Sequence, residues 1–380
     1  MKEKLQTLKI LAFVLLIVFL SSRGWASSRD IEKRAFVIME GIDAAPEDNF
    51  DVTYSLAAPQ VLESGGGEGG GGGGGKESLI LQKTRCKTLW QGHYFIQSKV
   101  EHPLFWGHLQ TLVLGEEMAR RGVSRVTDVF LRTAETRRKA WVTVADGKAD
   151  KILEAAPKTE KLPSLYIRRA LETENYLNMI PLIRVAEFIT CLTSPGEQAV
   201  APIVKADQES ISVVGLALFE EDKMVGKLDY NEMHYFFLTA QASGFMPKRF
   251  ETANGDGFVY EITDAKRRIK PHRNGNQISF TVSLQLEGNI IESESQRSLK
   301  DPEFLREAEQ AVSTALEKDC RAVLRKVQKE FKVDSYCFGA IVRARYPQLW
   351  KEINWTEEFP NVPIKITVDA RIRRLGMGAK

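Results

Sequence analysis

The chain has 380 residues, of which 43% are hydrophobic and 27% charged, a composition typical of folded proteins and not of disordered chains. Its 53 Lys and Arg nearly balance its 50 Asp and Glu, and a net charge of only +3 argues against a nucleic-acid-binding protein. Four scattered cysteines without a CxxC pair, and five histidines without an HExxH motif, predict no disulfide framework, no metal site and no cofactor.

The N-terminus has the pattern of an export signal. Three lysines precede an unbroken apolar run at residues 10–20, which at about 1.5 Å per residue covers only about half of a bilayer's hydrocarbon core. This length is typical of a secretory signal peptide, and the small residue Ala26 offers a cleavage site. We therefore expect residues 1–26 to direct export, with an uncleaved N-terminal segment as the alternative.

Residues 27–198 are expected to form a mixed α/β N-terminal region with internal subdivisions. Strands predicted at 35–42 and 50–56 form a hairpin. Residues 64–75 hold ten of the 28 glycines and read as a flexible loop, and the missing GK[ST] ending argues against phosphate binding. Beyond this loop, strands are predicted at 79–81, 108–115 and 140–145, and helices at 88–98, 116–121, 126–132, 149–156 and 165–193, the last kinked before Pro181.

Residues 208–378 are expected to form a C-terminal domain. An apolar strand at 211–220 pairs with 224–228, and two alternating strands flank a turn at Asn274-Gly275. Asp301 and Pro302 mark the start of a long helix whose apolar spacing continues to residue 331.

The chain closes with an amphipathic strand at 364–373, in which apolar and polar residues alternate. Taken together, the predicted elements indicate the α+β (mixed α/β) class. We expect several small domains with mixed and antiparallel sheets, and a long helix near the C-terminus.

Six aromatic residues gather late in the sequence: Tyr336, Phe338, Tyr346, Trp350, Trp355 and Phe359. Tyr346 and Trp350 are one helical turn apart, so both rings can lie on one face. Aromatic residues at this density usually form a core, which is the favoured interpretation. The alternative is an interface or ligand contact made by Tyr336, Tyr346, Trp350 and Trp355.

No catalytic residue is predicted, because no GxSxG motif occurs and no cysteine has an activating local sequence. His108, which is expected to open a buried strand, reads as a packing residue. Glu116 and Glu117 read as partners of a helix dipole instead of an acid–base pair. Basic runs at 137–139, 266–268 and 371–374 read as solvated surface, with contact to anionic headgroups as the alternative.

Three segments carry a family resemblance. They are HLQTLVLGEEMARRG at 108–122, VGLALFEEDKMVGKL at 214–228 and DSYCFGAIVRARYPQLW at 334–350. Together with RDIEKRAFV at 29–37, and in this order, they resemble the Ger(x)C family, the C subunits of nutrient germinant receptors in endospore-forming bacteria. The resemblance covers nearly the whole mature chain and implies a mixed α/β protein of several small domains.

The resemblance also implies a non-enzymatic receptor subunit in spore germination, exported to the outer face of the spore inner membrane and assembled with A and B membrane subunits. The family usually carries a lipobox cysteine just before a tryptophan, whereas Gly24 precedes Trp25 here. We therefore expect no lipid anchor, and association with the membrane surface through partner subunits or an uncleaved N-terminal segment. Two other functions stay open: an extracytoplasmic nutrient-binding module near the aromatic cluster and, less favoured, an exported hydrolase.

Overall fold

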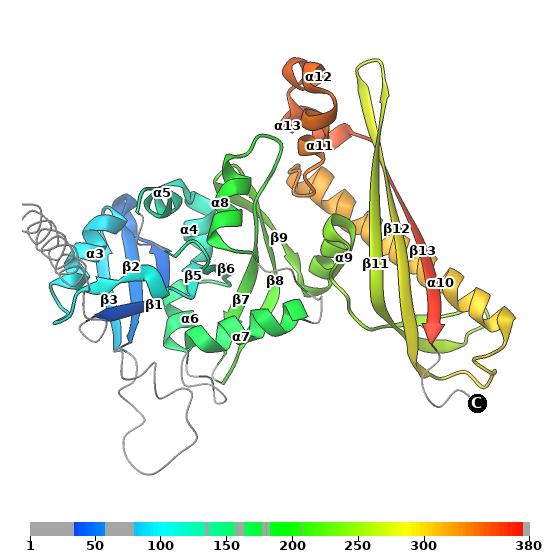
Figure 1. Cartoon of the computed structure of the whole chain (residues 1–380), viewed down its shortest axis with the longest axis horizontal. Helices are drawn as coiled ribbons and strands as arrows, with labels where there is room; N and C mark the ends of the chain where they lie inside the picture. Colours follow the sequence, from blue (N-terminus) through cyan, green and yellow to red (C-terminus); the bar gives the residue numbers. More distant parts are fainter. Residues whose placement is uncertain are drawn as a thin grey trace, which may run out of the picture.

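The computed structural model describes residues 34–57, 80–133, 137–155, 157, 163–176, 180, 183–207 and 209–374. The predicted signal peptide at 1–26, the absent lipobox at residues 24–25 and the glycine-rich loop at 64–75 lie outside these residues. Figure 1 shows two sheets side by side, each covered by helices. This arrangement confirms the predicted mixed α+β class.

The first sheet has nine strands in the order β3-β2-β1-β5-β6-β7-β8-β9, with β4 beside β1. Its strands are β1 (Ala35–Ala44), β2 (Phe50–Ala57), β3 (Ile80–Cys86), β4 (Leu104–Phe105), β5 (Thr111–Leu114), β6 (Trp141–Ala145), β7 (Val200–Ala206), β8 (Ile211–Glu220) and β9 (Lys223–Asp229). The central strands β1, β5, β6 and β7 run parallel, and antiparallel hairpins extend both edges. Strands β1, β5 and β6 are mostly apolar and are buried along almost their whole length, because helices cover both faces of the sheet.

The helices that pack on the first sheet form two layers, and this sheet with its helices is called the first half of the protein below. Helices α3 (Leu89–Gln97), α4 (Glu116–Arg121), α5 (Ser124–Arg132) and α8 (Val185–Thr193) share one core with the sheet, and α6 (Ala149–Glu154) and α7 (Pro163–Tyr176) share the other. The single helix predicted over 165–193 is wrong, because α7 and α8 are separate helices. The chain between them is extended at Arg184, which bridges to Trp141 of β6. The predicted kink before Pro181 lies outside the described residues.

The second sheet has the order β10-β11-β12-β13. Strands β10 (Lys248–Glu251), β11 (Gly257–Asn274) and β12 (Gln277–Ser293) are antiparallel, and β13 (Ile364–Arg374) joins β12 in parallel. The predicted turn at Asn274-Gly275 joins β11 to β12, and Gly275 has the positive φ that such a turn requires.

One long helix crosses the sheet, as Figure 1 shows. Helix α10 (Pro302–Arg325) begins at Asp301, whose side chain accepts a hydrogen bond from the Glu303 N–H, and it continues as a π-helical turn over Lys326–Phe331. Both the predicted N-cap and the predicted end at residue 331 are therefore confirmed. Three short helices then precede β13: α11 (Phe338–Arg345), α12 (Pro347–Glu352) and α13 (Trp355–Glu358).

The second sheet, with α10 and the three short helices, is the second half of the protein. The two halves are joined through β9 and α9 (Tyr230–Gln241). Lys326 beyond α10 pairs with Glu232 of α9 at 2.7 Å, and the Phe331 ring packs on Gly226 of β9 so closely that a Cβ there would lie 2.5 Å from it. The predicted domain boundary, residues 198–208, contains β7, a strand that pairs with β8 in the same sheet. The division into two domains at this point stays a prediction.

Candidate functional site

A buried carboxylate organises the segment in which the sequence predicted an aromatic cluster. The side chain of Asp334 precedes α11 and accepts hydrogen bonds from the backbone N–H groups of Phe338 (3.1 Å) and Gly339 (2.6 Å). It also accepts one from the indole Nε1 of Trp355 at 2.8 Å. Burial raises the pKa of Asp334 to about 7, against the opposing effect of these donors.

The aromatic rings around Asp334 form a packed core. Tyr336, Phe338, Trp355 and Phe359 are buried, and Tyr346 and Trp350 are half-buried against the same cluster. Phe338 lies 4.7 Å from Phe280 of β12, measured between ring centroids, and 6.4 Å from Phe359. The rings therefore tie the short helices to the second sheet. An interface or ligand contact by these residues remains untested.

The same segment contacts the first half of the protein. Gly196, in the loop after α8, accepts a hydrogen bond from the Ala340 N–H at 3.0 Å. Gly196 has φ +83°, and a Cβ on it would lie 2.7 Å from the backbone of Gly339 and 3.0 Å from the Trp350 ring. A side chain at position 196 would therefore push the two halves apart.

An open hollow lies beside Trp355, between the turn of the β11–β12 hairpin and the last short helices. Its cavity volume is about 710 Å³, a size suited to a small molecule. Polar residues supply most of its lining, namely His272, Arg273, Asn274, Asn276, Gln277, Ser279, Glu358 and Asn361, and the apolar part is Ile278, Ile353, Trp355, Val362 and Pro363. Arg273 also lies over the Tyr346 ring, 5.8 Å from its centroid. The hollow thus adjoins two of the four predicted contact residues.

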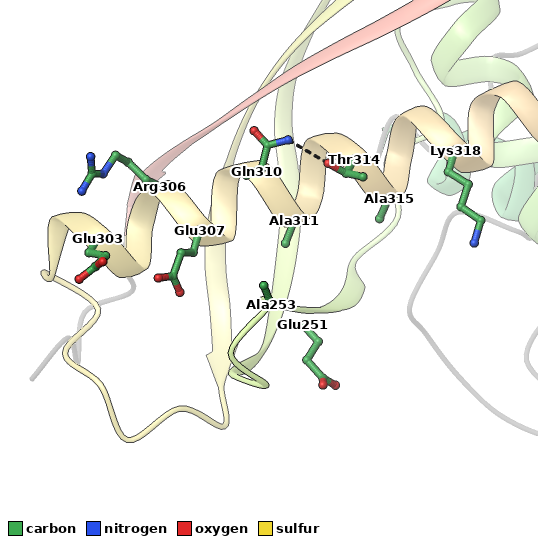
Figure 2. Close-up of a pocket in the computed structure, with 10 residues that line it drawn as sticks. All are labelled: Glu251, Ala253, Glu303, Arg306, Glu307, Gln310, Ala311, Thr314, Ala315 and Lys318. Atoms are coloured by element: carbon green, nitrogen blue, oxygen red, sulfur yellow. Dashed lines mark hydrogen bonds between the residues drawn. The ribbon is translucent and has the colours of Figure 1, made fainter.

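A second groove runs along the outer face of α10 (Figure 2). Charged residues Glu251, Glu303, Arg306, Glu307 and Lys318 surround small residues including Ala311 and Ala315. Glu307 is already engaged, because it accepts hydrogen bonds from Arg297 at 2.8 Å and from the Asn254 amide at 2.9 Å. The groove therefore offers mixed charge and no single preferred ligand chemistry.

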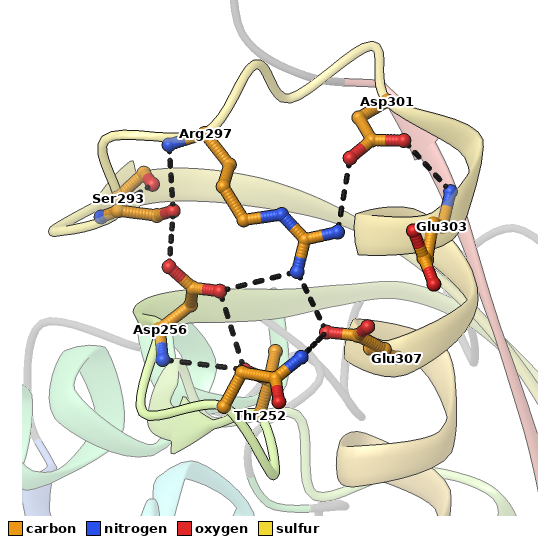
Figure 3. Close-up of polar contacts among 9 residues, drawn as sticks. Thr252, Asp256, Ser293, Arg297, Asp301, Glu303 and Glu307 are labelled. Atoms are coloured by element: carbon orange, nitrogen blue, oxygen red, sulfur yellow. Dashed lines mark hydrogen bonds and ion pairs between the residues drawn. The ribbon is translucent and has the colours of Figure 1, made fainter.

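Figure 3 shows the polar network next to this groove. Arg297, in the connection from β12 to α10, binds the carboxylates of Asp256 (3.4 Å), Asp301 (2.9 Å) and Glu307 (2.8 Å). Asp301 is also the N-cap of α10. One guanidinium thus joins the loop after β10, the helix cap and the first turns of the helix, which is a structural role.

The other sequence candidates occupy ordinary structural positions. His108 ends a short 3-10 helix, Trp106–His108, so the prediction that it opens the buried strand is wrong; the strand begins at Thr111. Glu116 pairs with Arg120 and Glu117 with Arg121 across one turn of α4, as a dipole-matched helix predicts.

The basic run at 266–268 divides between the two faces of β11. All three side chains are exposed, and Lys266 and Arg268 lie on the face of the strand opposite to Arg267. Arg267 donates to the backbone oxygen of Thr239 at 3.4 Å, and burial lowers the pKa of this guanidinium. In an exposed strand successive side chains alternate in direction, so a run of basic residues does not make one basic patch.

The sequence analysis did not identify Asp334 as the residue to which the segment 334–359 is hydrogen-bonded. The N-cap residue of α11 is Cys337, so the sequence rule for helix caps does not point to Asp334 three residues earlier. The tryptophan donor comes from 21 residues further along the chain, and nothing in the sequence indicates that contact.

The thiols are not activated. Burial raises the pKa of Cys86 and Cys191 to about 11 and that of Cys320 and Cys337 to about 12, so all four stay protonated near neutral pH. Within the described ranges no three His, Cys, Asp or Glu side chains gather closely enough to hold a metal ion. No helix among these residues is both long and apolar enough to cross a membrane.

Comparison with known proteins assigns both halves of the chain. Residues 27–206 match the family described as spore germination protein N-terminal domain, and residues 214–376 match the family described as spore germination B3/GerAC-like, C-terminal. The chain is 25% identical to spore germination protein YndF of Bacillus subtilis (strain 168), with 99% of each chain covered. It is 24% identical to spore germination protein B3 of the same organism, over 97% of this chain and 98% of that one.

A solved structure has the same fold. The crystal structure of the GerBC protein superposes with a TM-score of 0.59 at 21% identity, covering 88% of this chain and 96% of that one.

Proposed function

Because the chain belongs to the Ger(x)C family of spore germination receptor C subunits, we propose that it is a non-enzymatic subunit of a nutrient germinant receptor. The observation that carries the proposal is the match to both family domains, in order, over 27–206 and 214–376. A match to one domain alone would leave the rest of the chain free to perform a different function.

The chemistry of the described residues is consistent with a role without catalysis. Asp334, an ionisable group at the aromatic cluster whose pKa is strongly raised, has its carboxylate oxygens occupied by N–H donors of the protein itself. The raised thiol pKa values argue against a cysteine nucleophile. We infer that the segment 334–359 stabilises the fold and holds the two halves together.

The proposed place of action is the outer face of the spore inner membrane, in a complex with A and B subunits. The apolar run at residues 10–20 supports export. Since no cysteine precedes Trp25, attachment would rely on partner subunits or on an uncleaved N-terminal segment and not on a lipid anchor.

The test is affinity purification of the tagged full-length chain from spore membranes. We expect an A subunit and a multispanning B subunit to be recovered with it, and recovery to be lost for an unrelated exported protein carrying the same tag. Recovery of the chain without either subunit, from membranes that contain both, would contradict the receptor proposal.

A second candidate function, direct nutrient binding, is favoured by the hollow beside Trp355. Its polar lining could orient a small nutrient while Trp355 and Ile353 supply apolar contact. The test is calorimetric titration of the full-length chain with a panel of amino acids, sugars and nucleosides. Binding that Arg273→Ala abolishes and Lys318→Ala leaves unchanged would support it, and no heat change with any nutrient would refute it.

A further inference from the structure

The outward face of helix α3 is unusual for a surface helix. Its sequence, LWQGHYFIQ, contains no Asp, Glu, Lys or Arg. Leu89, Gly92, His93 and Ile96 are buried against the sheet. On the opposite side, Trp90 is 61% exposed, Tyr94 is 73% exposed and Phe95 is 36% exposed. A surface helix normally places charged residues on its outer face, and this one places aromatic rings there.

The apolar surface extends beyond α3. Seven large apolar side chains are exposed among the described residues, and six lie in α3 and the elements that contact it. Besides the three aromatic residues of α3, these are Ile80 and Leu81 of β3 and Leu131 of α5. Ile80 and Leu81 are consecutive in β3, so only one of the two can face the same side as α3. The three exposed aromatic rings of α3 therefore make up the main part of this apolar surface, and exposed apolar side chains gathered on one element mark a surface that contacts another apolar phase or partner.

The lysines that flank α3 indicate what kind of surface its exposed face would bind. Lys87 immediately precedes the N-cap of α3, and Lys99 immediately follows its C-cap; both are exposed. The Lys99 ammonium donates one hydrogen bond, to the backbone oxygen of Lys83 at 3.4 Å, and has two further N–H groups. Glu101, two residues further along, lies 3.7 Å from His102. Aromatic rings between flanking lysines match a bilayer interface, where Trp and Tyr lie at the headgroup level and Lys reaches the phosphates.

The first described strand, β1, begins close to α3. The Ala35 N–H at the start of β1 donates to the Pro103 oxygen at 3.0 Å, and the next residue, Leu104, donates its N–H to the side chain of Gln97 in α3 at 2.8 Å. The first described strand therefore begins next to α3. Figure 1 shows α3 at the end of the molecule opposite to β13.

We propose that the outward face of α3 is a membrane-contact surface that lies in the headgroup region of an anionic bilayer. Trp90, Tyr94 and Phe95 enter the interface, and Lys87 and Lys99 bind lipid phosphates. The inference rests on the proposed function, which brings the chain to a membrane, and it names the surface that makes contact. A protein that is held by one weak membrane contact dissociates readily. A second contact, made by the outward face of α3, would therefore prolong the attachment of this chain to the membrane.

The test uses the full-length chain in vesicles of phosphatidylcholine and phosphatidylglycerol, with the photo-crosslinking residue benzoylphenylalanine in place of Tyr94. A matched chain carries it in place of Lys318, an exposed residue of α10 in the other half. We expect lipid adducts at position 94 in several-fold excess over position 318. Equal yields at the two positions would overturn the proposal, and so would a cross-link between two copies of the chain in place of lipid.

A charge-reversal variant tests the lysines separately. Lys87→Glu combined with Lys99→Glu should reduce the adduct yield at position 94 on vesicles with phosphatidylglycerol and leave it unchanged on pure phosphatidylcholine. An identical loss on both would contradict the role in phosphate binding. Because Tyr94 points to solvent, Tyr94→Ser should leave the melting temperature unchanged, which separates surface effects from misfolding. Recovery of receptor subunits without lipid adducts would refute only the contact surface, and the proposed function would stand.

Discussion

The buried carboxylate of Asp334 provides the sharpest test of how the C-terminal segment is held together. Its two oxygens accept hydrogen bonds from the N–H groups of Phe338 and Gly339 and from the Trp355 indole. Asp334→Ala would leave all three donors buried without a partner. Asp334→Asn keeps the shape and one carbonyl oxygen, but it turns an N–H₂ group toward at least one donor.

The expected cost follows from the number of donors left unsatisfied. At about 1–3 kcal/mol for each buried unsatisfied group, Asp334→Asn should cost about 1–3 kcal/mol. Asp334→Ala should cost roughly three times as much, a large share of a typical domain stability of about 5–15 kcal/mol. We therefore expect the alanine variant to lose the native packing of α11 to α13, and the asparagine variant to fold with a lower melting temperature.

The pH dependence of stability tests the same group independently. Burial raises the pKa of Asp334 from 3.8 to about 7 in the folded protein, so the folded state holds a proton that the unfolded state has released between these values. The contribution of this group is therefore fully favourable below about pH 4 and is lost as the pH rises through 7. A shift of about three units corresponds to about 4 kcal/mol.

The assay is urea unfolding at a series of pH values between 4 and 8, followed by tryptophan fluorescence, for the wild type and Asp334→Asn. The wild type should lose stability relative to the asparagine variant across this interval. Asp369→Asn, at an exposed position of β13, is the matched control and should follow the wild type. Parallel curves for the wild type and Asp334→Asn would refute the reasoning, because they would mean that the N–H donors keep the carboxylate ionised.

Substitutions at three further positions probe the packing. Trp350→Ala, at a half-buried ring 6.2 Å from Trp355, should cost about 3 kcal/mol and lower the melting temperature without changing which nutrient triggers germination; unchanged stability with altered nutrient preference would contradict the core assignment. Gly226→Ala should lower the melting temperature, because its Cβ would meet the Phe331 ring where the two halves join. Thr314→Ala, at an exposed position of α10, is the control and should leave the melting temperature unchanged. Arg297→Ala and Arg297→Lys should both lower the melting temperature, since a lysine lacks the planar fork that reaches three carboxylates; full rescue by lysine would refute that geometry.

The sequence predicted those parts of the fold in which local signals agree with the final structure. Alternating residues and a turn at Asn274-Gly275 located β11 and β12, and Asp301 followed by Pro302 located the start of α10. The helix over 165–193 was overpredicted, because its apolar spacing gives no indication that Arg184 bridges to Trp141 of β6. Strand order was also beyond the sequence, since the parallel pairing of β12 with β13 depends on residues about 80 positions apart.

The candidate site, too, could be predicted from the sequence only in part. The density of aromatic residues between 336 and 359 predicted a core, and four of the six are fully buried. The hydrogen bonds of Asp334 to the start of α11 and to Trp355, and the contact of Gly196 with Gly339, could not be predicted. Such contacts depend on two surfaces meeting at a fixed distance, and local pattern carries no information about distance.

The position of Asp334 also limits where nutrient discrimination could lie in this chain. The carboxylate fixes the Trp355 indole from one side, through Nε1, so this ring cannot rotate to follow different ligands. Arg273, Asn274 and Glu358 also line the neighbouring hollow, and they lie at the end of β11 and at the end of α13. Under the second candidate function, direct nutrient binding, a change in nutrient preference should follow substitutions at these three positions and leave stability intact. Substitutions at Asp334 or Trp355 should instead reduce the amount of folded protein for every nutrient alike. The reverse pattern would show that the aromatic cluster itself recognises the nutrient.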